Sequence, residues 1–249
     1  MSDRPPFSRR EFLNYSWLAS LGFVFALIAC NIPSWLLPKK EKEPLPKSFI
    51  LFASSMGLDI GRRLNREPLL DMSQNQTTEM LWNLQDSNNK TSVYIHSKAG
   101  ARIPDVIKWI EHDSIPDNNA NDIFIIIGGN EIASEIPKDK LSGEAEKIID
   151  LAIAVNKRFI GKKVHFVLPP QTLLDKDDPR FEYEVRRQIF NSAIILNLKR
   201  ASEERRIIDI EEPIKLDDLV SGPSIFRDAR HFKEDIIDAI IYRINEQIK

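Results

Sequence analysis

The sequence predicts an α/β domain built around a parallel sheet. From residue 48 onward, short apolar segments rich in Ile, Val and Phe alternate with longer segments whose apolar residues recur at helical spacing. The apolar run at residues 123–127 has no polar interruption, which is typical of a strand covered on both faces. Strands that alternate with helices are joined by right-handed crossovers, so the sheet is expected to be parallel, with helices flanking it.

Five segments are expected to form the strands. They are residues 48–53, 92–96, 123–127, 163–168 and 206–210. The expected helices cover residues 58–64, 104–111, 140–159 and 178–201, and a C-terminal helix carries Ile237, Ile240 and Ile244 on one face. Residues 65–90 are polar and irregular, with one short helix expected at 78–84, because Met80, Leu81 and Leu84 would share a face there.

The N-terminal segment is expected to lie outside this domain. Arg9 and Arg10 precede Phe12-Leu13 and an uncharged, mostly apolar stretch that reaches Leu37. This pattern matches a twin-arginine export signal. The expected organisation is therefore a signal or membrane anchor at 1–37, a charged linker at 38–47 and the domain at 48–249.

Three fates of the N-terminal segment remain open. Leu27 to Cys30 resembles a lipobox, which would make the protein a lipoprotein anchored through lipid on Cys30. The stretch 12–37 also exceeds the roughly 20 residues that span a bilayer, so it can be an uncleaved anchor. The third is a free periplasmic or secreted protein. All three place the domain across the cytoplasmic membrane.

Composition argues against several classes of function. Lys and Arg number 35 and Asp and Glu 37, and no basic run points to nucleic acid. Cys30 is the only cysteine, so no disulfide framework is expected. The four histidines lack metal-ligand spacing, and three of them, His96, His112 and His165, are interpreted as structural or surface residues. We expect no metal and no cofactor.

Four short stretches of the sequence lie next to the ends of predicted strands and helices. Ser54-Ser55, Gly100 and Gly128-Gly129-Asn130 each follow a strand, and the group from Asp228 to His231 precedes the last helix. Because the carboxyl ends of parallel strands meet at one edge of a sheet, the first three are expected to lie together there. The fourth can fold over the same edge.

These residue types suit acyl transfer through a serine. A serine hydroxyl needs a nearby base, and the His231 imidazole supplies one, with Asp228 three residues earlier to orient it. The N–H groups of Ser55 and Gly100 and the amide of Asn130 can stabilise the oxyanion. Taken singly, each residue has a plainer interpretation, such as a helix cap or a turn glycine.

In their order along the chain, these groups resemble the conserved blocks of the SGNH/GDSL hydrolases, a family named for its serine, glycine, asparagine and histidine. The resemblance implies a flavodoxin-like three-layer α/β/α sandwich with a five-stranded parallel sheet. It also implies that Ser55 is the nucleophile, that His231 is base and acid, oriented by Asp228, and that Gly100 and Asn130 complete the oxyanion hole. The first block departs from Gly-Asp-Ser-Leu, since it reads Ala53-Ser54-Ser55-Met56. Either Ser55 or Ser54 can therefore align with the nucleophile.

The resulting functional hypothesis is an exported or membrane-anchored serine hydrolase that cleaves an ester through an acyl-enzyme. An exported location suggests O-acetyl groups of envelope polysaccharide, or lipid esters, as substrates. Two alternatives remain open. One is an O-acyltransferase that uses the same triad, and the other is an inactive SGNH-like binding protein, which the altered first block would explain.

Overall fold

The computed structural model describes residues 47–69, 79–87, 90–115, 120–133, 135–170, 177, 181–204, 206–207, 210–216 and 232–248. All of them belong to the compact unit Pro44–Lys249. The predicted signal or anchor with Cys30 and nearly all of the predicted linker lie outside these residues. Asp228 and His231 lie outside them too.

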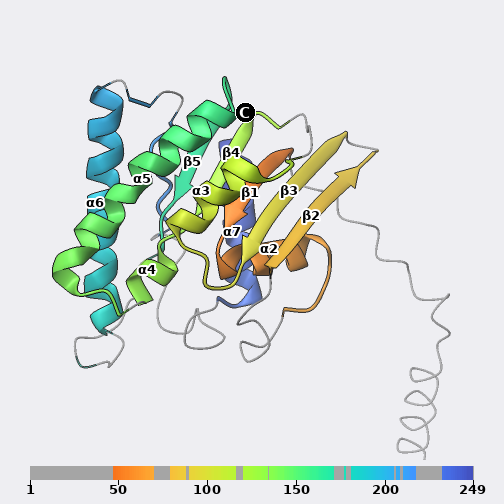
Figure 1. Cartoon of the computed structure of the whole chain (residues 1–249). Coiled ribbons are helices and arrows are strands. Elements are labelled where there is room, and N and C mark those ends of the chain that lie inside the picture. Colours follow the sequence, from red (N-terminus) through yellow and green to blue (C-terminus); the bar gives the residue numbers. More distant parts are fainter. Residues whose placement is uncertain are drawn as a thin grey trace, which may run out of the picture. The chain divides into compact units, whose positions relative to one another are not determined.

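The sheet has five strands among the described residues, in the order β2-β3-β1-β4-β5 (Figure 1). Four of them are parallel to one another and match predicted strands. They are β1 (Phe49–Ala53), β3 (Thr91–Lys98), β4 (Asp122–Ile126) and β5 (Lys163–Val167). The order of these four, with the second strand outside the first, is that of the flavodoxin-like fold. The predicted α/β fold class is confirmed.

The sheet is mixed, because β2 (Glu79–Asp86) runs antiparallel to β3. The predicted short helix at 78–84 is therefore wrong. Exposure alternates along β2, with Leu81 61% exposed and Trp82 5% exposed, which is the period of a strand. Met80, Leu81 and Leu84 fit helical spacing as well, so the apolar pattern of this short segment did not separate the two structures.

The predicted fifth parallel strand, 206–210, is shifted and shortened. Ile210 and Ile214 form parallel bridges with Val164 and Val167 of β5. The Ile214 N–H donates to the carbonyl of Phe166 at 2.8 Å, and the Leu168 N–H donates to the carbonyl of Ile214 at 3.0 Å. Among the residues described here, 210–214 follow the outer side of β5 through two isolated bridges and form no continuous strand.

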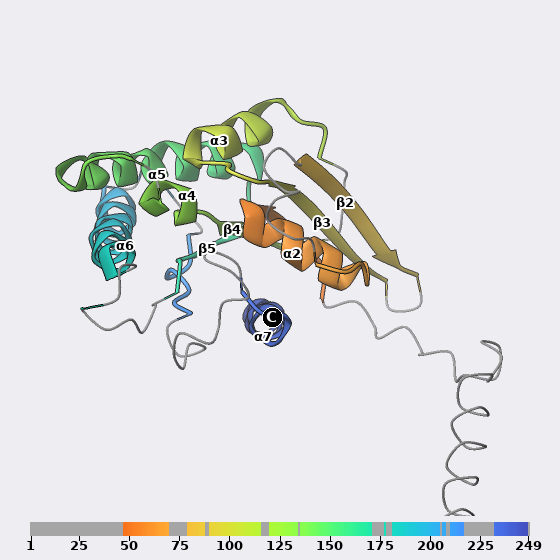
Figure 2. The same cartoon turned by 90° about the horizontal axis from the view of Figure 1, so that it is seen from below.

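Helices cover both faces of the sheet, as the two views show (Figures 1 and 2). Helices α3 (Ile103–His112), α5 (Lys138–Arg158) and α6 (Phe181–Glu203) pack on one face, and α2 (Ser55–Leu64) and α7 (Glu234–Gln247) on the other. Their positions agree with the predicted helices to within a few residues. The short helix α4 (Gly129–Ala133) stands where only a turn was expected.

Each face of the sheet has its own apolar core. In β4, Ile123 and Ile125 belong to the core under α3, α5 and α6, whereas Phe124 and Ile126 belong to the core under α2 and α7. Alternate residues of a strand point to opposite faces, which explains why this segment is apolar throughout. Within the described part of the chain, no helix is long and apolar enough to span a membrane.

Candidate active site

Three of the predicted site residues follow the ends of three neighbouring strands, at one edge of the sheet. Ala53, the last residue of β1, lies opposite Ser97 in β3 and opposite Ile126 in β4. The chain leaves these three positions toward Ser55, Gly100 and Asn130 respectively (Figure 1). As predicted, the three segments emerge side by side.

Ser54 is held in place by its backbone. Its N–H donates to the carbonyl of Ile126 at 3.2 Å, and its carbonyl accepts from the Gly57 N–H at 2.9 Å and from Ser97 Oγ at 2.5 Å. The residue is buried and occupies the N-cap of α2, but its side chain makes no capping hydrogen bond. Ser55 follows as the first residue of α2 and is partly exposed.

The first turn of α2 lies unusually close to the sheet. A Cβ atom at Gly57 would lie 2.5 Å from the Ala53 Cβ and 2.8 Å from Ser97 Oγ. One turn later, a Cβ at Gly61 would lie 2.5 Å from the ring of Trp82. Glycine at both positions therefore lets α2 pack directly on β1, β2 and β3, and this fixes where Ser55 stands.

The Gly100 turn and the Asn130 side chain are joined. Gly100 has φ +78°, a conformation that favours glycine, and the Ala101 N–H closes the turn on the carbonyl of Lys98 at 3.2 Å. Asn130 Nδ2 donates to the carbonyl of Ala101 at 2.8 Å. Because a carbonyl only accepts, this bond fixes which end of the amide faces the turn. Nδ2 carries a second hydrogen for another acceptor.

Glu131 ties α4 to α3 from inside the protein. Its Oε1 accepts a hydrogen bond of 2.8 Å from the N–H of Ile103, the first residue of α3. The side chain is buried, and this burial raises the pKa of the Glu131 carboxyl above its ordinary value, although the bonds from the Ile103 N–H and other groups oppose the rise. Two consecutive residues of α4, Asn130 and Glu131, are thus hydrogen-bonded to the segment 101–103.

Two further contacts set the position of α4. Arg186 of α6 donates from Nε to the carbonyl of Ile132 at 2.6 Å. Gly128, just before α4, has φ +107°, and a Cβ there would lie 2.9 Å from the Phe190 ring and 3.0 Å from Pro169. The glycine exit after β4 is therefore required by both backbone conformation and close packing.

His96 has a more elaborate environment than the sequence indicated. It is buried, and its ring stacks on Trp109 with centroids 4.0 Å apart. Nε2 is hydrogen-bonded to Glu79 at 2.9 Å, whereas Nδ1 lies 2.9 Å from Asp113 Oδ2 without hydrogen-bond alignment. Glu79 comes from the strand that was predicted to be a helix, so this cluster could not be found from the sequence.

The other two histidines also have structural or surface positions, as predicted. His165 is buried, and its Nε2 lies 2.8 Å from Asp122 Oδ1. The side chain of His112 is exposed. Within the described ranges, no three His, Cys, Asp or Glu side chains are placed to hold a metal ion.

The predicted base and its partner cannot be placed, because Asp228 and His231 lie outside the described residues. The next residue, Phe232, is described. It is buried in the core between the sheet and α2 and α7, a core that also contains Ala53 and Leu58. These two residues flank Ser55 in the sequence.

Comparison with solved structures shows which proteins have a similar fold. A proposed GDSL-like lipase from Parabacteroides merdae superposes with a TM-score of 0.50 at 13% identity, covering 84% of this chain and 100% of that one. The fold is that of the GDSL hydrolases. The acetylxylan esterase Axe2 from Geobacillus stearothermophilus shares this GDSL-type fold, with a TM-score of 0.50 at 12% identity, covering 84% and 97%.

A proposed platelet activating factor from Streptococcus pneumonia is also similar, with a TM-score of 0.52 at 13% identity, covering 90% of this chain and 99% of that one. A comparison with protein-family models gives no match, and neither does a sequence comparison with curated proteins. The similarity of fold to the GDSL hydrolases, which the short sequence motifs predicted, is thus found by comparing structures and not by comparing whole sequences.

Proposed function

We propose that this protein is an SGNH-type serine hydrolase that cleaves ester bonds through an acyl-enzyme. The observation that carries the proposal is the hydrogen bond from Asn130 to Ala101. It ties Asn130, one predicted oxyanion donor, to the residue that follows Gly100, another predicted donor. The bond lies beside the end of the strand that leads to Ser55.

Ser55 is the proposed nucleophile in preference to Ser54. The backbone bonds of Ser54 and its burial leave it little freedom to meet a substrate. Ser55 is partly exposed and begins α2, where a helix presents N–H groups without intrahelical acceptors and the positive end of its dipole. The free N–H groups and the helix dipole both favour a negatively charged intermediate at Ser55.

The proposed reaction has two halves. Ser55 Oγ attacks the ester carbonyl carbon while His231 takes the hydroxyl proton. The tetrahedral intermediate collapses, the alcohol leaves with that proton, and the acyl group stays on Ser55. Water then attacks the acyl-enzyme with His231 again as base, releasing the carboxylic acid and restoring the serine.

Three donors would stabilise the oxyanion in both halves. They are the N–H groups of Ser55 and Gly100 and the second Nδ2 hydrogen of Asn130. Gly100 is exposed, and among the described residues none apart from its two chain neighbours has an atom within 4 Å of the place where its Cβ would be. This open space supports the proposal, because a substrate carbonyl must approach the Gly100 backbone closely.

His231 would act as base and acid, with Asp228 orienting it. The position of Phe232 supports this role. Phe232, the residue that follows His231 in the sequence, is buried in the core that contains Ala53 and Leu58, on the α2 side of the sheet. Proteins of the same fold include an acetylxylan esterase and a proposed GDSL-like lipase. A carbohydrate or lipid ester, met outside the cytoplasmic membrane after export, is therefore the proposed substrate class.

Hydrolysis of p-nitrophenyl acetate tests this proposal. Ser55→Ala and His231→Ala should each lower kcat by about 10³-fold or more, whereas Ser54→Ala should retain most of the activity. Circular dichroism of each variant checks that it is folded. An intact, folded protein that cleaves neither p-nitrophenyl acetate nor an acetylated xylo-oligosaccharide would refute the proposal.

A further inference from the structure

The helix α4, which carries Asn130, is too short to hold its own position. It has five residues, Gly129–Ala133, which is little more than one helical turn. A first turn is unfavourable by itself, because several backbone angles must be fixed for each hydrogen bond that is gained. The orientation of the Asn130 side chain therefore depends on the contacts that other elements make with α4.

Arg186 of α6 makes one such contact at the C-terminal end of α4. Its Nε donates to the carbonyl of Ile132 at 2.6 Å. The last carbonyls of a helix lack a donor within the helix, so a charged donor from another element is favourable there. The Ile132 side chain is buried in the core under α3, α5 and α6. Two residues after Asn130, the chain is thus held through both its backbone and its side chain.

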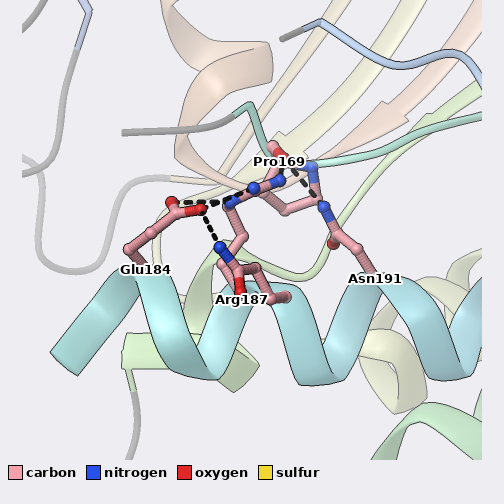
Figure 3. Close-up of polar contacts among 5 residues, drawn as sticks. Pro169, Glu184, Arg187 and Asn191 are labelled. Atoms are coloured by element: carbon pink, nitrogen blue, oxygen red, sulfur yellow. Dashed lines mark hydrogen bonds and ion pairs between the residues drawn. The ribbon is translucent and has the colours of Figure 1, made fainter. Parts of the chain in front are cut away.

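Arg187, the next residue of α6, holds a different segment (Figure 3). Consecutive residues of a helix point about 100° apart, so the two arginines reach different parts of the chain. Arg187 Nη1 donates to the carbonyl of Pro169 at 3.3 Å, and Asn191 Nδ2 donates to the same carbonyl at 3.0 Å. The Arg187 guanidinium is itself oriented by Glu184, with Nε at 2.8 Å and Nη2 at 2.7 Å from the two carboxylate oxygens. Buried side chains of α6 therefore fix the Pro169 carbonyl.

Pro169 in turn restricts the backbone that enters α4. A Cβ at Gly128 would lie 3.0 Å from the Pro169 ring and 2.9 Å from the ring of Phe190, which belongs to α6. The chain at Gly128 is therefore packed against α6 and against the proline that α6 holds. Helix α6 thus sets both ends of the segment 128–132, of which Asn130 is the middle residue.

We propose that Arg186 is a positioning residue for the side-chain amide of Asn130. One Nδ2 hydrogen of Asn130 is directed to the Ala101 carbonyl, and the direction of the other depends on how α4 is held. An error of about 1 Å in the position of a catalytic group can cost about 10²-fold in rate. The effect of Arg186 on catalysis rests on the proposed function, whereas its effect on the Asn130 amide does not.

Two substitutions at Arg186, which is only partly buried, separate hydrogen bonding from packing. In Arg186→Gln, Nε2 is as many bonds from the backbone as the arginine Nε, so the bond to Ile132 can form. Arg186→Met has a methyl group at that place and cannot donate. For p-nitrophenyl acetate, Arg186→Met should lower kcat about tenfold or more with KM unchanged, and Arg186→Gln should retain most of kcat. Equal losses of kcat in the two variants, or no loss in Arg186→Met, would overturn the proposal.

The matched control is Arg200→Met on the same helix. Arg200 is exposed and its Nε lies 2.8 Å from Glu204, at the far end of α6. This variant should leave kcat and KM unchanged. Circular dichroism checks that each variant is folded.

A double variant tests whether Arg186 acts through Asn130. In Asn130→Ala the amide is already absent, so adding Arg186→Met should change kcat by less than about twofold. A further loss of about tenfold in the double variant would overturn the proposal, because Arg186 would then affect catalysis by another route.

NMR tests the position of the amide without requiring catalysis. The side-chain amide signal of Asn130 in the isotope-labelled full chain is identified by its absence from Asn130→Ala. This signal should shift in Arg186→Met and stay in place in Arg186→Gln and Arg200→Met. An unchanged signal in Arg186→Met would overturn the proposal. Absence of all ester cleavage would refute the proposed function, while the Asn130 signal would still decide the positioning role.

Discussion

Asn130 Nδ2 donates a hydrogen bond of 2.8 Å to the carbonyl of Ala101, 29 residues earlier in the chain. The bond crosses from α4, at the end of β4, to the turn that follows β3. Those two strands are not neighbours, because β1 lies between them. The Asn130 side chain therefore lies beside the end of β1, which leads to Ser55, and the proposed mechanism requires an oxyanion donor there.

Asn130→Ala should lower kcat for p-nitrophenyl acetate by about 10²-fold or more, because one oxyanion donor is removed. Asn130→Asp should be equally impaired, since a carboxylate accepts but cannot donate. Asn197→Ala, in the C-terminal half of α6, is the control and should leave kcat unchanged. An Asn130→Ala variant with the original kcat would remove this residue from the site.

Gly57→Ala should destabilise the protein by about 1–3 kcal/mol, since its Cβ would lie 2.5 Å from the Ala53 Cβ. It should also reduce activity, because the first turn of α2 must move and Ser55 moves with it. Gly143→Ala in α5 is the matched control, because no described residue outside its own helix turn and chain neighbours has an atom within 4 Å of the added Cβ. There we expect a gain of about 0.5–1 kcal/mol from helix propensity, measured by urea unfolding.

The raised pKa of Glu131 should make the stability of the protein depend on pH. Its folded-state pKa is raised above 4.5, so between 4.5 and that value the folded protein binds a proton that the unfolded chain has released. The contribution of Glu131 to stability therefore falls as pH rises through this window and then stays constant. Glu131→Gln keeps an acceptor for the Ile103 N–H and should remove this fall. Urea unfolding from pH 4 to pH 8 measures it, and identical pH profiles would contradict the account.

The lowered pKa of Glu79 should make stability depend on pH in the opposite direction. Its hydrogen bond to His96 is the largest cause that lowers the pKa of Glu79 below 4.5, and Lys98 adds to it. The stabilising contribution is therefore present above pH 4.5 and is lost as pH falls through the folded-state pKa. Protonation should loosen β2 first, since Glu79 belongs to this edge strand. Amide exchange in β2 should accelerate at low pH, and Glu79→Gln should reduce that change; uniform acceleration across the sheet would argue against it.

The sequence predicted those parts of the fold in which local pattern and tertiary packing agree. The apolar run at 123–127 is buried on both faces, and its pattern alone indicates a central strand. Because parallel strands place their carboxyl ends together, the meeting of Ser55, Gly100 and Asn130 at one edge followed from topology.

Contacts between distant segments could not be predicted in this way. The spacing of Met80, Leu81 and Leu84 suits both a helix and a strand, and only pairing with β3 selects the strand. The bond from Glu131 to Ile103 depends on how α3 and α4 pack, which no local pattern encodes. Likewise, no local pattern predicts that the carboxylates of Glu79 and Asp113 lie beside His96.

The central claim is that Ser55 is the nucleophile, and mapping a covalent adduct tests it most directly. The full chain is treated with a fluorophosphonate, digested, and the modified residue identified by tandem mass spectrometry. The account predicts a single adduct on Ser55 that is lost in His231→Ala, because the serine then lacks its base. An adduct on Ser54, or no adduct on the folded protein, would contradict it.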